Sequence, residues 1–100
     1  MKYILGAPGS GKTKEILRLS EENRIPILCE SQARKERLLE RAMQYGYVVP
    51  VPIVFSELTN KDKVVYIDDI ERLLTAMFGV KVDTLTLNLL NPNDVTTLKE

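Results

Sequence analysis

Short apolar runs alternate along this chain with segments of helical periodicity. The runs are rich in aliphatic or β-branched residues and are bounded by Gly, Pro or polar residues, which predicts buried strands. The run Val48–Phe55 is interrupted by Pro50 and Pro52, so its first part is expected to be irregular. The expected strands are Tyr3–Leu5, Ile27–Cys29, Ile53–Phe55, Val64–Ile67 and Thr84–Leu87.

Between these runs, apolar residues recur at the spacing of one helix face. The first expected helix begins near Lys12 and ends at Asn23 or Arg24, and the other two cover residues 32–45 and 70–78. Ser31 is suited to cap the second helix, and Gly46 and Gly79 are suited to end the second and third. In the second helix we expect the charged residues to cover the outer, solvated face: Arg34, Lys35, Glu36, Arg37, Glu40 and Arg41.

Strands that alternate with helices favour a parallel sheet with helices on both faces. We therefore predict an α/β fold, a three-layer α/β/α sandwich. With 100 residues, the chain fits a single domain that spans residues 1–100.

The composition excludes several classes of catalytic site and binding partner. The formal net charge is zero, so a basic field that would draw the whole protein to nucleic acid or an anionic membrane is lacking. Cys29 is the single cysteine and there is no histidine, which excludes an intramolecular disulfide, Ser-His-Asp or Cys-His catalysis, and a Cys/His zinc site. No apolar run approaches the ~20 residues that span a bilayer. We expect a cytoplasmic protein with no membrane partner.

The stretch Gly6-Ala7-Pro8-Gly9-Ser10-Gly11-Lys12-Thr13 satisfies the phosphate-loop pattern G-x-x-x-x-G-K-[ST]. Gly6, Gly9 and Gly11 are expected to allow backbone angles that a Cβ would forbid, so that successive N–H groups face an anion. Lys12 is expected to contact the β- and γ-phosphates, and the Thr13 hydroxyl to coordinate Mg²⁺. The alternative is a Gly-rich turn that binds nothing.

Two carboxylates directly follow the run Val64–Ile67. Asp68 is expected to support the metal, directly or through a water molecule. Asp69 is expected to polarise the water that attacks the γ-phosphate. The alternative for this pair is that one aspartate caps the helix beginning at Ile70.

With both motifs in hand, the chain resembles the P-loop NTPase superfamily, with Gly6–Thr13 at the Walker A position and Val64–Asp69 at the Walker B position. It is most similar to the branch with an extra strand between these motifs, which holds AAA+ ATPases, RecA-like proteins and helicases. The resemblance implies a central parallel five-stranded sheet in the order 5-1-4-3-2. The short chain is similar to compact P-loop ATPases of phage and mobile-element genomes.

The same resemblance implies further roles. Asn88 follows the fifth expected strand, where the branch places a polar sensor of the γ-phosphate; the alternative is an Asn that caps a strand. The stretch Cys29–Leu58 resembles the nucleic-acid-contacting region of superfamily-one helicases; the alternative is a solvated charged face. No Arg follows Arg72, so the late arginine finger of AAA+ proteins has no counterpart, and no other Arg is favoured.

These observations predict a slow Mg²⁺-dependent ATPase that acts as a nucleotide-dependent switch or a partner-activated subunit. ATP is the expected nucleotide, with GTP as the alternative, and the expected partners are another protein or further copies of this chain. Two other functions stay open. A small-molecule kinase would use Asp69 to accept a proton from the acceptor hydroxyl. A non-catalytic nucleotide sensor would present Tyr45, Tyr47 and Val48–Phe55 to a partner, unless that run packs into the core.

Overall fold

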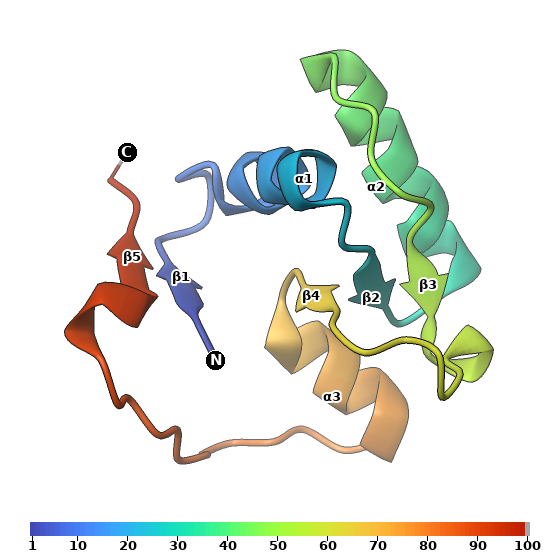
Figure 1. The fold of residues 1–100 in the computed structure, drawn as a ribbon. Helices are drawn as coiled ribbons and strands as arrows, with labels where there is room; N and C mark the ends of the chain where they lie inside the picture. The colour runs from blue at the N-terminus through green and yellow to red at the C-terminus, as the bar shows by residue number, and fades with distance from the viewer. Residues whose placement is uncertain (100) are drawn as a thin grey trace.

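Short strands and three longer helices alternate in the computed structural model, which describes residues 1–99 (Figure 1). The elements in chain order are β1 (Tyr3–Leu5), α1 (Lys12–Asn23), β2 (Ile27–Cys29), α2 (Gln32–Tyr45), β3 (Ile53–Val54), the 3₁₀ helix η1 (Phe55–Glu57), β4 (Tyr66–Ile67), α3 (Ile70–Phe78), the 3₁₀ helix η2 (Pro92–Asp94) and β5 (Val95–Thr97).

The three predicted helices are confirmed, and their ends are set by local chemistry. The Ser31 hydroxyl accepts a hydrogen bond from the Arg34 backbone N–H at 3.1 Å, which caps α2. Gly46 and Gly79 end α2 and α3 in the left-handed conformation, with φ of 78° and 70°. Arg24 closes α1 in the same conformation despite its side chain, with φ of 54°.

The predicted continuous sheet in the order 5-1-4-3-2 is wrong. The strands form two parallel sheets, one of β1 and β5 and the other in the order β3-β2-β4. In the predicted order the third strand lay between the second and the fourth. In the structure β2 lies between β3 and β4, in agreement with the complete burial of its three residues. The short β3 directly follows Pro52, and a strand entered through a proline is suited to a sheet edge.

The predicted fifth strand is also wrong. Thr84–Leu87 has no regular structure, and the strand that pairs with β1 is Val95–Thr97 instead. Leu85 and Leu87 are 45% and 58% exposed, so the apolar side of the predicted strand is only partly covered by the residues that the structure describes. Of the predicted strand Val64–Ile67, only the last two residues pair, with β2.

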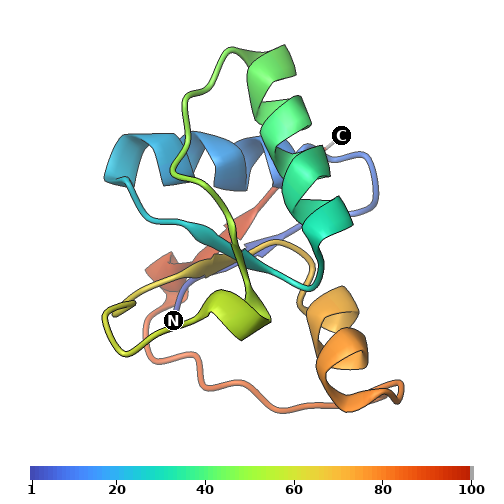
Figure 2. The same cartoon turned by 90° about the vertical axis from the view of Figure 1, so that its right-hand side faces the viewer.

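The core lies where α1 and α2 meet the three-stranded sheet. Figure 2 shows these two helices on one side of the strands and α3 on the other. The buried cluster consists of Ile16, Leu17, Ile27, Cys29, Leu38, Ala42 and Val54. Tyr45, Tyr47 and Val49 are half-buried against this cluster, so part of the predicted partner surface packs on the core instead.

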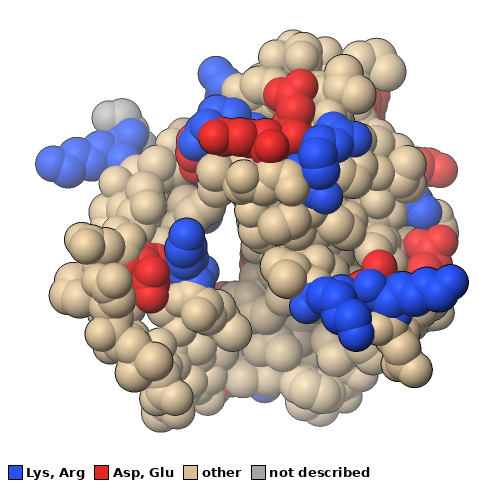
Figure 3. All heavy atoms as spheres, in the orientation of Figure 1, with Lys and Arg blue, Asp and Glu red and all other residues tan. Residues whose placement is uncertain are grey.

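The chain exposes more surface than its mass requires. The accessible surface is 7301 Å², whereas a compact 11.4-kDa monomer exposes about 5,800 Å². Figure 3 shows an opening between the part that carries β1 and β5 and the rest of the molecule. Val80, Leu87, Leu89 and Leu90, in the segment after α3, are all more than half exposed.

Within residues 1–99, no helix has the length and apolar character needed to cross a membrane.

Candidate functional site

The loop between β1 and α1 turns tightly through two left-handed glycines. Gly9 and Gly11 have φ of 82° and 92°, a region that disfavours residues with a Cβ. The Ser10 N–H donates to the Ala7 carbonyl at 3.0 Å, and Gly11 is the N-cap residue of α1. The loop therefore ends at the positive end of a helix dipole, the arrangement that favours a bound anion.

Gly6 is needed for a different reason from the one predicted. Its φ is not in the left-handed region, unlike that of Gly9 and Gly11. A Cβ added at Gly6 would collide with the Ser10 hydroxyl and would lie 3.0 Å from Ser10 Cβ and 3.3 Å from Lys12 Cγ. Gly6 thus provides space for the loop to fold back on itself.

Lys12 lies over this loop. Its Nζ donates hydrogen bonds to the Gly6 carbonyl at 2.6 Å and to the Ala7 carbonyl at 2.9 Å. An ammonium has three protons to donate, so one remains after these two bonds. The positive charge of Lys12 is therefore held at the loop, next to the helix end.

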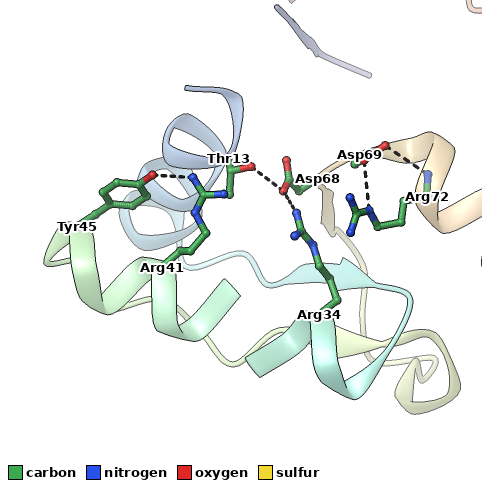
Figure 4. A network of polar contacts seen from close by, with 7 residues as sticks. All are labelled: Thr13, Arg34, Arg41, Tyr45, Asp68, Asp69 and Arg72. Carbon is green, nitrogen blue, oxygen red and sulfur yellow. Dashed lines mark hydrogen bonds and ion pairs between the residues drawn. The ribbon is translucent and has the colours of Figure 1, made fainter. Parts of the chain in front are cut away.

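Thr13 in α1, Arg34 in α2 and Asp68 directly after β4 meet beside the loop (Figure 4). The Thr13 hydroxyl donates to Asp68 Oδ2 at 3.0 Å, and Arg34 Nη2 donates to the same oxygen at 2.7 Å. The Arg34 and Asp68 side chains are only 10% and 8% exposed. Breaking a buried ion pair of this kind by removing one partner typically costs about 3–5 kcal/mol.

The position of Arg34 corrects the sequence prediction, which placed it on the solvated face of α2. Arg34, Leu38 and Ala42 are the buried residues of α2 and recur every four positions. That spacing was visible in the sequence, but a charged residue is rarely read as part of a buried stripe. Sequence reasoning therefore missed Arg34 as a residue of the site.

Asp69 is turned away from Asp68 and toward α3. It is the N-cap residue of α3 with φ of 65°, and its Oδ1 accepts from the Arg72 N–H at 3.3 Å. Its Oδ2 accepts from Arg72 Nε at 3.4 Å, and its side chain is 43% exposed. The capping interpretation of Asp69 is therefore confirmed, and its carboxylate lies at the surface.

Asn88 lies apart from the phosphate loop. Its backbone carbonyl accepts a hydrogen bond from the Tyr3 hydroxyl at 2.8 Å, and Tyr3 is the first residue of β1. The phosphate loop follows the other end of that strand. Asn88 lines a shallow pocket of about 360 Å³ together with Met1, Tyr3, Thr86, Leu87, Leu90 and Asp94. The structure brings together Gly6–Thr13 and Asp68, but it does not bring Asn88 to them.

Three carboxyl or thiol groups outside these contacts have shifted pKa values. A hydrogen bond from Arg18 lowers the pKa of Glu15, which lies in the first turn of α1. The N–H of Val54 lowers the pKa of Glu57, and burial raises the pKa of the Cys29 thiol. The direction of the Cys29 shift agrees with its place in the core.

Comparison of the chain with protein-family models, with curated proteins and with solved structures found no match.

Proposed function

We propose that this chain binds ATP with Mg²⁺ at Gly6–Thr13 and hydrolyses it slowly, as a P-loop NTPase. One observation carries the proposal. The Thr13 hydroxyl lies 3.0 Å from an Asp68 carboxylate oxygen, although the two residues are 55 positions apart in the chain. Thr13 immediately follows Lys12, whose ammonium lies on the phosphate loop. A hydroxyl, a carboxylate and an ammonium beside a helix N-terminus are the groups that hold a metal-bound triphosphate.

The donor set suits Mg²⁺. This ion prefers oxygen ligands and binds through one or two carboxylates together with substrate phosphates and water. Thr13 and Asp68 would hold it, and among residues 1–99 no group of three His, Cys, Asp or Glu side chains forms a closed metal cage. When bound, Mg²⁺ would neutralise charge on the β- and γ-phosphates.

In the proposed hydrolysis, a water oxygen forms a bond to the γ-phosphorus while the bond from that phosphorus to the β–γ bridging oxygen breaks. ADP and phosphate leave, and the proton of the water passes to a carboxylate or to solvent. Lys12 and the loop N–H groups would stabilise the charge on the phosphoryl oxygens. Asp69 is the candidate base, but Arg72 engages both of its oxygens. Because these hydrogen bonds occupy the Asp69 carboxylate, we expect a low intrinsic rate of ATP hydrolysis.

The test is calorimetric titration of a non-hydrolysable ATP analogue with Mg²⁺ into wild type and Lys12→Ala. Loss of charge-assisted hydrogen bonds of about 1.5–3 kcal/mol predicts roughly 10- to 100-fold weaker binding by Lys12→Ala. Lys14→Ala is the matched control, because Lys14 is an exposed lysine in the same helical turn. Equal affinity of Lys12→Ala and wild type would refute the proposal.

A second candidate is a nucleotide sensor that does not turn over and acts through a partner. The engagement of Asp69 by α3 favours it, because the carboxylate expected to act as the base accepts hydrogen bonds from Arg72 on both of its oxygens. The surface excess of about 1,500 Å² on this one chain exceeds the roughly 800 Å² that each partner of a standard complex buries, so either version of the function is proposed to involve a partner or a second copy. Phosphate release at background level, with solution mass showing a stable complex, would favour the sensor.

Both versions place the chain where ATP and Mg²⁺ are abundant, and we propose a cytoplasmic location. The mixed charges on the face drawn in Figure 3 form no broad basic surface there, so nucleic acid is not included in the proposal.

A further inference from the structure

The Arg34–Asp68 pair is unusual because its two charges meet at the oxygen that also contacts Thr13. Arg34 Nη2 and Thr13 Oγ1 lie 2.7 Å and 3.0 Å from Asp68 Oδ2. The side chains of Arg34 and Asp68 are nine-tenths buried or nearly so. The cation next to this carboxylate is therefore supplied by the chain itself, from the first turn of α2.

The pair is incompletely satisfied. Arg34 Nε is buried and has no hydrogen-bond partner among the described residues. A buried donor without a partner destabilises the arrangement that contains it, so the guanidinium would gain a bond by turning to a new acceptor. The Arg34 backbone is fixed by the Ser31 cap at 3.1 Å, which leaves the side chain as the part that can move.

We propose that Arg34 is an internal counterion of Asp68, which it leaves when metal-bound nucleotide occupies the phosphate loop. This inference rests on the proposed function. Two cations at one carboxylate oxygen repel each other strongly in a buried site. Arg34 must therefore release Asp68 as the metal site fills, and a phosphate oxygen is then the acceptor with the charge and geometry that a guanidinium prefers. Nucleotide occupancy is thereby transmitted to the first turn of α2.

The test compares the Mg²⁺ requirement for nucleotide binding in wild type, Arg34→Gln and Arg37→Gln. Arg37 lies one turn further along α2 and is exposed, so it matches the change of charge without touching Asp68. With a non-hydrolysable ATP analogue in calorimetry, the Mg²⁺ concentration for half-maximal binding should fall at least roughly tenfold in Arg34→Gln. It should stay at the wild-type value in Arg37→Gln.

A merely structural ion pair would give a different result. Arg34→Gln would then lower thermal stability but need as much Mg²⁺ as wild type, and that outcome overturns the inference. Wild type that binds no nucleotide at any Mg²⁺ concentration overturns the proposed function as well. The two failures are thus distinguishable.

Arg34→Gln removes one half of a buried pair, so a second measurement uses wild type alone. The side-chain Nε–H signal of Arg34 is followed by NMR and assigned by its absence in Arg34→Lys. Saturation with Mg²⁺ and the ATP analogue should shift this signal, because the guanidinium that carries Nε leaves Asp68 for a phosphate oxygen. A signal that does not move at saturation overturns the inference.

Discussion

Replacing Gly6 by alanine tests how tightly the phosphate loop is folded. The new Cβ would collide with the Ser10 hydroxyl and would lie 3.0 Å from Ser10 Cβ and 3.3 Å from Lys12 Cγ. Forcing extra atoms into a packed site typically costs about 1–3 kcal/mol. A glycine-to-alanine change returns about 0.4–1 kcal/mol by restricting the unfolded chain. At the middle of these two ranges, Gly6→Ala should lose roughly 1–2 kcal/mol of unfolding free energy.

The assay is thermal denaturation combined with binding of the ATP analogue. For a domain of this size, 1–2 kcal/mol corresponds to a fall in Tm of roughly 4–16 °C. Ser10→Gly removes both Ser10 atoms that meet the new Cβ, including a buried hydroxyl that has no partner in residues 1–99. The double variant Gly6→Ala/Ser10→Gly should therefore regain most of the lost stability, a coupling that the double-mutant cycle measures.

Two results would refute this reasoning. Gly6→Ala with wild-type Tm and wild-type affinity would mean that the loop has room for a Cβ. A double variant that is as unstable as the sum of its single changes would mean that Ser10 is not the group that Gly6 accommodates. Gly46→Ala is the control for backbone strain, because Gly46 has a φ of 78° but open space around its Cβ position.

Three further predictions concern ionisable groups. Asp69→Asn preserves both the cap and the tolerance of a left-handed backbone, so its Tm should match wild type, while phosphate release should slow at least roughly 100-fold if Asp69 is the base; an unchanged rate removes that role. The lowered pKa of Glu57, caused by the Val54 N–H and by Lys35, stabilises the fold above the usual value of 4.5 and ceases to do so as pH falls through the lowered pKa. The Tm gap between wild type and Glu57→Gln should thus close between pH 7 and pH 3, and a constant gap contradicts the assignment. Because burial raises its pKa, Cys29 should be alkylated by iodoacetamide at least roughly tenfold more slowly at pH 8 than in the urea-unfolded chain, as followed by mass spectrometry; equal rates would show that β2 is open.

The helices and the phosphate loop could be predicted from the sequence because their signals are local. Ser31 caps α2, and Gly46 and Gly79 end α2 and α3, each within a turn of the residues it affects. The loop pattern joins a strand to a helix over eight consecutive residues. Such contacts depend on neighbours in the chain and need no knowledge of the fold.

Strand pairing could not be predicted in the same way. Strands of two or three residues carry too few alternating positions to specify a neighbour or a register. The residues of Thr84–Leu87 favour a strand, but this segment forms none. Val95–Thr97, which follows the 3₁₀ helix at Pro92–Asp94, pairs with β1 instead. The strand order implied by the resemblance to P-loop NTPases is wrong for β2. It placed this strand at the edge of the sheet, whereas β2 is completely buried and central in its sheet.

Part of the candidate site could be predicted from the sequence and part could not. Thr13 and Asp68 were predicted to act together, and the structure joins them directly. Arg34 was predicted to lie on the solvated face with the other charged residues of this helix, because an Arg/Glu face is usually solvated. Its contact with Asp68 spans 34 positions, and only a three-dimensional structure reveals it.

We propose above that metal-bound triphosphate lies between the phosphate loop and Asp68. Mn²⁺ can replace Mg²⁺ with the ATP analogue, and its paramagnetism broadens the NMR signals of nearby amides. The amides of Gly11, Lys12, Thr13 and Asp68 should broaden first as Mn²⁺–nucleotide is added, and Lys12→Ala should need roughly 10- to 100-fold more nucleotide for the same effect. Broadening centred on Asn88 and Tyr3, or none at saturating Mn²⁺–nucleotide, would contradict the proposal.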